Sequence, residues 1–129
     1  MNQRSLAVVN LVPITLAAIT TNTNHTAVDL LPAAGNANIG RREMKATASV
    51  LMTANTTSDT IKLQDNTTSD TTGFVDITGA VFTAATTSGE LTPIHFLTNK
   101  RYVRAVSTVA GTTPSVQQTI NILVEQRAS

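Results

Sequence analysis

The chain has 129 residues, of which 41% are hydrophobic and only 13% are charged, and its formal net charge is +1. A chain of this length suits one domain with one core, and so weak a positive charge argues against the basic surface of a nucleic-acid binder. The absence of cysteine excludes disulfides, thiolate metal sites and a cysteine nucleophile.

The N-terminal segment is apolar but interrupted. Its aliphatic run, from Leu6 to Ile19, is broken by Asn10, Pro13 and Thr15. The run is too short and too polar to span a bilayer, so no membrane contact is expected. Proline cannot donate to a sheet ladder, which predicts a break at Pro13. Residues 1–20 are therefore expected to form either an extended arm or an edge strand. If they form an arm, Leu11 and Val12 are candidates for contacting a partner.

Alternating apolar and polar residues predict strands along the rest of the chain, and no stretch shows convincing helical periodicity. The expected strands are Thr26–Leu31, Met44–Thr53, Thr60–Asp65, Phe74–Ile77, Leu91–Thr98, Arg101–Val109 and Val116–Glu125. With the N-terminal segment they make about eight short strands separated by turn residues. This pattern predicts an all-β fold, a single-domain antiparallel β-sandwich of jelly-roll-like form over residues 1–129.

Polar turn residues separate these strands. The pentapeptide NTTSD occurs twice, at Asn55–Asp59 and at Asn66–Asp70, on either side of one strand. We interpret both copies as loops, because Thr, Ser and Asn side chains can satisfy nearby backbone groups in turns. The segment Thr78–Ala80 is expected to form another turn.

The two faces of the expected strands differ in composition. The predicted core includes Val50, Ile61, Leu63, Val103, Ile120 and Ile122. In Arg101–Val109 the opposite face carries Tyr102, Arg104 and Val106. Tyrosine and arginine are enriched at protein interfaces, so these three residues are interface candidates. The remaining candidates are basic residues, namely Arg101, Arg41 and Arg42. The alternative is an exposed face on which the stem of an arginine covers Tyr102.

No arrangement of residues in the sequence indicates catalysis or a cofactor. The two histidines, His25 and His95, have no acidic neighbour at a motif spacing, and no GxSxG, HExxH or phosphate-binding glycine motif occurs. The aspartates at 59, 65, 70 and 76 match no calcium loop and are interpreted as turn formers. The expectation is a protein that is not an enzyme and has no metal or cofactor.

A longer stretch resembles a known family. The segment DTIKLQDNTTSDTTGFVDITGAVFTAATTSGE, Asp59–Glu90, followed by NKRYVRAVSTVAGTTPS, is similar to small structural proteins encoded in the capsid modules of tailed bacteriophages. The resemblance covers the chain from Thr47 onward. It implies a capsid decoration (cement) protein with a β-sandwich or jelly-roll fold, binding the outside of a shell of major capsid subunits as a dimer or trimer. No cofactor or catalysis is implied.

The functional hypothesis combines this resemblance with the low charge. We expect a virion structural protein, made in the host cytoplasm and located on the capsid exterior, that stabilises contacts between major capsid subunits. The expected partners are the major capsid protein and further copies of the chain, with no nucleic acid. The alternatives are another phage structural component, such as a tail-tip, fibre or head-completion protein, and a carbohydrate-binding β-sandwich module.

Overall fold

The computed structural model describes residues 4–12, 18–30 and 42–127. Within these ranges the chain forms strands and contains no helix, so no described helix could cross a membrane. The strands are β1 Arg4–Val12, β2 Thr23–Asn24, β3 Val28–Asp29, β4 Arg42–Met52, β5 Thr56–Asn66, β6 Val75–Val81, β7 Gly89–Thr98, β8 Tyr102–Gly111 and β9 Val116–Arg127.

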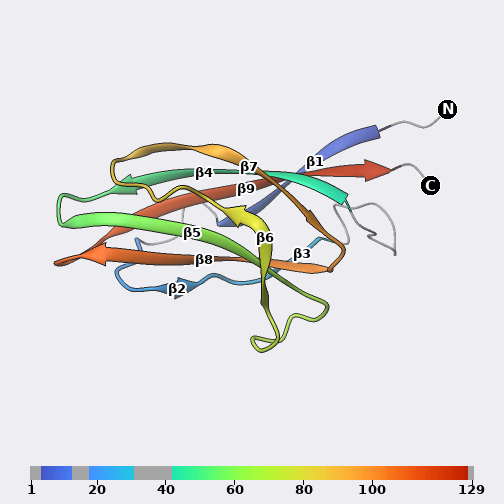
Figure 1. Cartoon of the computed structure of the whole chain (residues 1–129), viewed down its shortest axis with the longest axis horizontal. Helices are drawn as coiled ribbons and strands as arrows, with labels where there is room; N and C mark the ends of the chain where they lie inside the picture. The colour runs from blue at the N-terminus through green and yellow to red at the C-terminus, as the bar shows by residue number, and fades with distance from the viewer. Residues whose placement is uncertain (1–3, 13–17, 31–41, 128–129) are drawn as a thin grey trace.

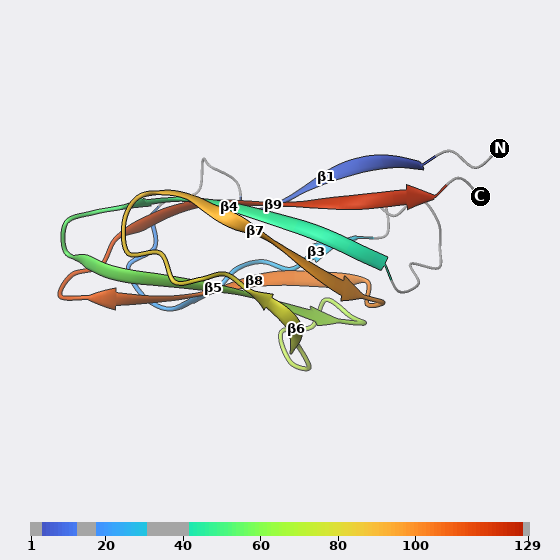
Figure 2. The same cartoon turned by 45° about the horizontal axis from the view of Figure 1, so that its top comes forward.

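The strands form two antiparallel sheets that pack face to face (Figures 1 and 2). Sheet A has four strands in the order β1-β9-β4-β7. Sheet B has five strands, in the order β2-β8-β5-β6 with β3 also paired to β8. The predicted antiparallel β-sandwich is thus confirmed.

The core lies between the inner faces of the two sheets. In sheet A, the pairing of β4 with β9 sets Ala46 opposite Ile122 and Ala48 opposite Ile120, all of them buried. In sheet B, Leu63 of β5 lies opposite Ala105 of β8, and both are 0% exposed. Strict alternation along each strand sends the intervening residues outward. The predicted core is confirmed at Val50, Ile61, Leu63, Val103, Ile120 and Ile122.

The N-terminal segment is an edge strand of sheet A. Strand β1 pairs with β9 from Arg4↔Arg127 to Val12↔Ile120 and ends directly before Pro13. Leu11 and Val12 are 4% and 1% exposed and belong to the core. Their proposal as interface residues is corrected here, because an aliphatic strand end beside β9 stabilises the fold more by closing the core than by facing solvent.

The first NTTSD segment is not a loop, contrary to the prediction. Thr56 to Asp59 lie in β5, where Asp59 pairs with Val109 of β8 and its backbone also exchanges hydrogen bonds with Ala85. The turn between β4 and β5 falls at Thr53–Asn55 instead. The second copy does form a loop, after β5 ends at Asn66. Identical pentapeptides therefore adopt different structures because only the first, from Thr56 onward, pairs with a neighbouring strand.

The predicted turn at Thr78–Ala80 is also part of a strand. These residues lie inside β6, where the pairing with β5 shifts register between Lys62 and Gln64. Gly79 has a φ of 79°, which only glycine adopts without strain. The glycine thus marks a bulge rather than a chain reversal.

Candidate functional site

The predicted interface residues of β8 lie on the outer face of sheet B but are engaged within the chain. Tyr102, Arg104 and Val106 are all partly buried. Nε of Arg104 donates to Oε1 of Gln64 at 2.9 Å, and its guanidinium carbon lies 4.3 Å from the ring centroid of Phe74. A guanidinium held by a hydrogen bond and an aromatic face has less of its surface left for a partner.

Arg101 is held in the same way. Its Nε and Nη2 donate to the two carboxylate oxygens of Asp29 at 2.9 and 2.8 Å, and its guanidinium carbon is 5.3 Å from the ring centroid of Tyr102. The bidentate pair joins the short strand β3 to the start of β8, and its hydrogen bonds raise the pKa of Arg101 above the usual value. This arginine therefore stabilises the edge of sheet B.

A third charged group on sheet B is also satisfied internally. Asp76 of β6 accepts hydrogen bonds from Nε2 of Gln64 at 2.8 Å and from Nζ of Lys62 at 3.1 Å. These bonds hold the pKa of Asp76 below its ordinary value. Two ion pairs, Lys62–Asp76 and Arg101–Asp29, are thus satisfied within sheet B, whereas Arg104 is held by a neutral amide and an aromatic ring.

The remaining predicted interface residues do not join this group. Arg41 lies outside the described residues, and Arg42 is the first residue of β4, opposite Thr98 of β7. Leu11 and Val12 lie in the core. The structure therefore brings together only Arg101, Tyr102, Arg104 and Val106 from the predicted set.

The outer face of sheet A is very different, and the sequence reasoning did not single it out. Val8, Leu51 and Leu97 are 65%, 61% and 44% exposed there, and Leu123 is half-exposed beside Val8. Most neighbouring outward side chains are uncharged and polar, namely Asn10, Thr47, Ser49, Gln117, Thr119 and Asn121. Among the described side chains of this face, the acidic and basic ones are Lys45, Glu90 and His95.

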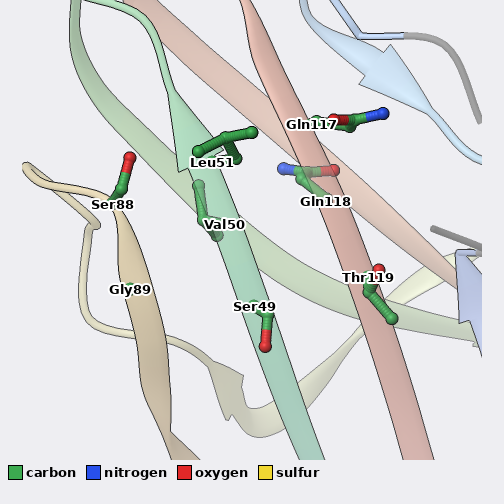
Figure 3. Close-up of a pocket in the computed structure, with 8 residues that line it drawn as sticks. All are labelled: Ser49, Val50, Leu51, Ser88, Gly89, Gln117, Gln118 and Thr119. Carbon is green, nitrogen blue, oxygen red and sulfur yellow. The ribbon is translucent and has the colours of Figure 1, made fainter.

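A shallow hollow of about 450 Å³ lies at one end of this face. Figure 3 shows it over β4, with Leu51 between Ser88 on one side and Gln117 on the other. The hydroxyl of Ser88 accepts from the backbone N–H of Met52 at 2.8 Å, which fixes the wall of the hollow. Its lining offers a leucine side chain and neutral hydrogen-bonding groups to a partner. The sequence does contain a signal for this surface. The outward residues of the alternating strands β4 and β9 include few charged ones.

A buried polar cluster lies between the sheets near this end. Asp59 and Ser107 of sheet B are 0% exposed, Gln118 of sheet A is 4% exposed, and His25 is 7% exposed. Oε1 of Gln118 accepts from Oγ of Ser107 at 2.9 Å and from Nε2 of His25 at 3.0 Å. Nε2 of Gln118 donates to Oδ2 of Asp59. Gln118 therefore ties the two sheets together through their interior.

The cluster has the geometry of a structural network. Because Gln118 Oε1 can only accept, Nε2 of His25 carries a hydrogen. Oγ of Ser107 donates its hydrogen to Gln118 and lies 3.5 Å from Nε2 of His25. His25 therefore does not act as a base toward the serine hydroxyl. Oδ1 of Asp59 is buried without a hydrogen-bond partner among the described residues. Elsewhere in the described ranges, no group of three or more His, Asp or Glu residues is placed to hold a metal ion.

We expect Asp59 to make stability fall with rising pH. Burial raises the pKa of Asp59 above 3.8 and lowers that of His25 below 6.5. A raised carboxyl pKa means that the contribution of Asp59 is fully present below about pH 3.8 and is lost as the pH rises through its folded-state pKa. We therefore compare the free energies of unfolding of the native protein and of Asp59→Asn. The native value minus the variant value should fall as the pH rises, by at most about 1.4 kcal/mol per pH unit.

Urea unfolding of both proteins from pH 3 to pH 8 measures this difference. His25, which faces the same glutamine, is present in both proteins, so to first order its own titration cancels. A difference that stays constant or rises with pH would contradict the assignment.

No protein-family model and no curated protein matches the chain. Among solved structures, the chain is similar to the SPBc2 prophage-derived protein YomS, with a TM-score of 0.49 and 14% sequence identity over 96% of each chain.

Proposed function

We propose that the protein is a virion structural protein, a capsid decoration protein that binds the outer surface of a phage head and stabilises contacts between major capsid subunits. The observation that carries the proposal is the described part of the outer face of sheet A around β4 and β9, where exposed aliphatic side chains lie among uncharged polar ones. A surface with few charged residues, made instead of aliphatic and neutral polar side chains, is typical of one that is covered in an assembly. The resemblance of residues from Thr47 onward to phage decoration proteins supplies the kind of assembly.

The contact is expected to centre on the hollow beside Leu51. A neutral surface has a low desolvation cost, and its hydroxyl and amide groups can pair with backbone on a capsid subunit. Each contact can be weak, because a shell repeats it many times and a bridging protein gains from binding two subunits at once. Sheet B, which carries the ion pairs Lys62–Asp76 and Arg101–Asp29, then faces solvent.

The test has two stages. Quantitative mass spectrometry of purified particles should find the chain in a copy number comparable to that of the major capsid protein. Its absence from particles would overturn the proposal, and a few copies per particle would identify a tail or head-completion component instead.

Particles stripped of the protein then serve as the probe for rebinding. Leu51→Lys should weaken binding by tenfold or more, which corresponds to about 1.4 kcal/mol or above. The matched control is Val75→Lys, an exposed valine (64%) on β6 of sheet B, and it should bind like the native protein. Equal binding by both variants would show that the outer face of sheet A is not the contact surface.

A further inference from the structure

Three of the sandwich edges are built in ways that prevent further strand pairing. On the outer side of β8, β2 and β3 are only two residues long each. Strand β6 contains the bulge at Gly79. Strand β7 contains Pro93, shifts register against β4, and lies beside β6. Short strands, bulges and prolines are the usual means of blocking edge-to-edge association.

The fourth edge, β1, has none of these features over most of its length. It is nine residues long and stays in continuous register with β9 from Arg4 to Asn10. From Ser5 to Val12 its sequence, SLAVVNLV, contains no proline, glycine or charged residue. Among the described residues, β9 is its only strand partner, and no described strand pairs with its other side. Figure 2 shows β1 at the margin of the upper layer.

We infer that β1 is a self-association edge, and that its partner is β1 of a second copy, paired antiparallel about a two-fold axis perpendicular to the sheet. This inference concerns the isolated protein and does not depend on capsid binding. The two sheets A would join into one continuous sheet of eight strands. Main-chain hydrogen bonds would replace the unpaired groups of both edges, as in other strand-addition complexes.

A second copy fits this edge better than a strand of another kind. The symmetric axis keeps the outer faces of both copies on one side, so outward residues of one β1 lie opposite outward residues of the other. Val8, 65% exposed on the native chain, would then gain cross-strand contacts. With no charge between Ser5 and Val12, antiparallel self-pairing opposes no like charges along this stretch. A partner chosen by charge would find nothing to recognise there.

Sedimentation velocity of the purified protein over a wide concentration range tests the inference. The native chain should form dimers of twice 13.6 kDa. Val8→Lys places a charge at the edge, a device that natural edge strands use against pairing, and should weaken dimerisation at least tenfold. The matched control Leu51→Lys changes an equally exposed residue of the same face, on the interior strand β4, and should dimerise normally.

A native protein that stays monomeric, or a dimer that is lost in Leu51→Lys but kept in Val8→Lys, would overturn the inference. A second measurement needs no variant. Hydrogen exchange of the β1 amides in the native protein should slow as its concentration rises, whereas the amides of β2 should not change. Concentration-independent exchange in β1 would also overturn it.

Discussion

Replacing Gly111 by alanine should cost at least about 3 kcal/mol of folding free energy, because it combines backbone strain with a direct clash. Gly111 ends β8 with a φ of 143°, where side chains are strained. A Cβ built there would lie 2.1 Å from the carbonyl oxygen of Asn55 and 3.0 Å from Cα of Thr56. Both neighbours are backbone, so no side-chain rotation can relieve the contact.

Urea unfolding against Gly89→Ala isolates the clash. Gly89 has a similar φ of 157° but nothing within 4 Å of its virtual Cβ. The Gly89 variant therefore carries the conformational cost without the collision, and its unfolding midpoint should lie well above that of Gly111→Ala. Equal midpoints for the two variants would show that the approach of Asn55 to β8 is not as close as described.

Truncating Ile122 to alanine is expected to cost about 2–5 kcal/mol. Ile122 is 0% exposed. It lies on β9, an interior strand of sheet A, opposite Val9 of β1 on one side and Ala46 of β4 on the other. Its removal leaves a cavity between strands that are held on both sides, so little collapse can compensate.

The matched control is the neighbouring Leu123→Ala, which removes a side chain of similar size from the opposite, half-exposed face. Thermal or urea unfolding should show a smaller loss for Leu123→Ala than for Ile122→Ala. The reverse order would place β9 one residue out of register, since such a slip inverts every side chain of a strand.

The sequence predicted the strands with alternating residues well, because alternation directly encodes which face is buried. Ile61 and Leu63 in β5 and Ile120 and Ile122 in β9 show this, and all four are fully buried. The prediction failed at Thr56–Asp59, where polar residues indicated a loop but the structure has part of β5. Whether such a segment becomes a strand depends on its pairing with β8, about 50 residues further along the chain. The composition of the segment itself does not indicate that pairing.

The candidate surfaces were predicted less well. Tyr102 and Arg104 do point outward, but the partners of Arg104 are Gln64 of β5 and Phe74 just before β6, so its engagement was invisible in one segment. The buried cluster was missed for a similar reason. His25, Asp59, Ser107 and Gln118 share no spacing motif and meet only when the two sheets pack.

The pairing of β1 with β9 also sets the order of events during synthesis. Residues 4–12 are made long before their partner, residues 116–127. Sheet A cannot close until β9 has been made, because β9 lies between β1 and β4. Such sequence-distant contacts slow folding and prolong the lifetime of exposed apolar strands. The newly made chain thus carries the aliphatic segment of β1 without its partner strand until β9 has been made, a demand on chaperones that a hairpin between adjacent strands would not create.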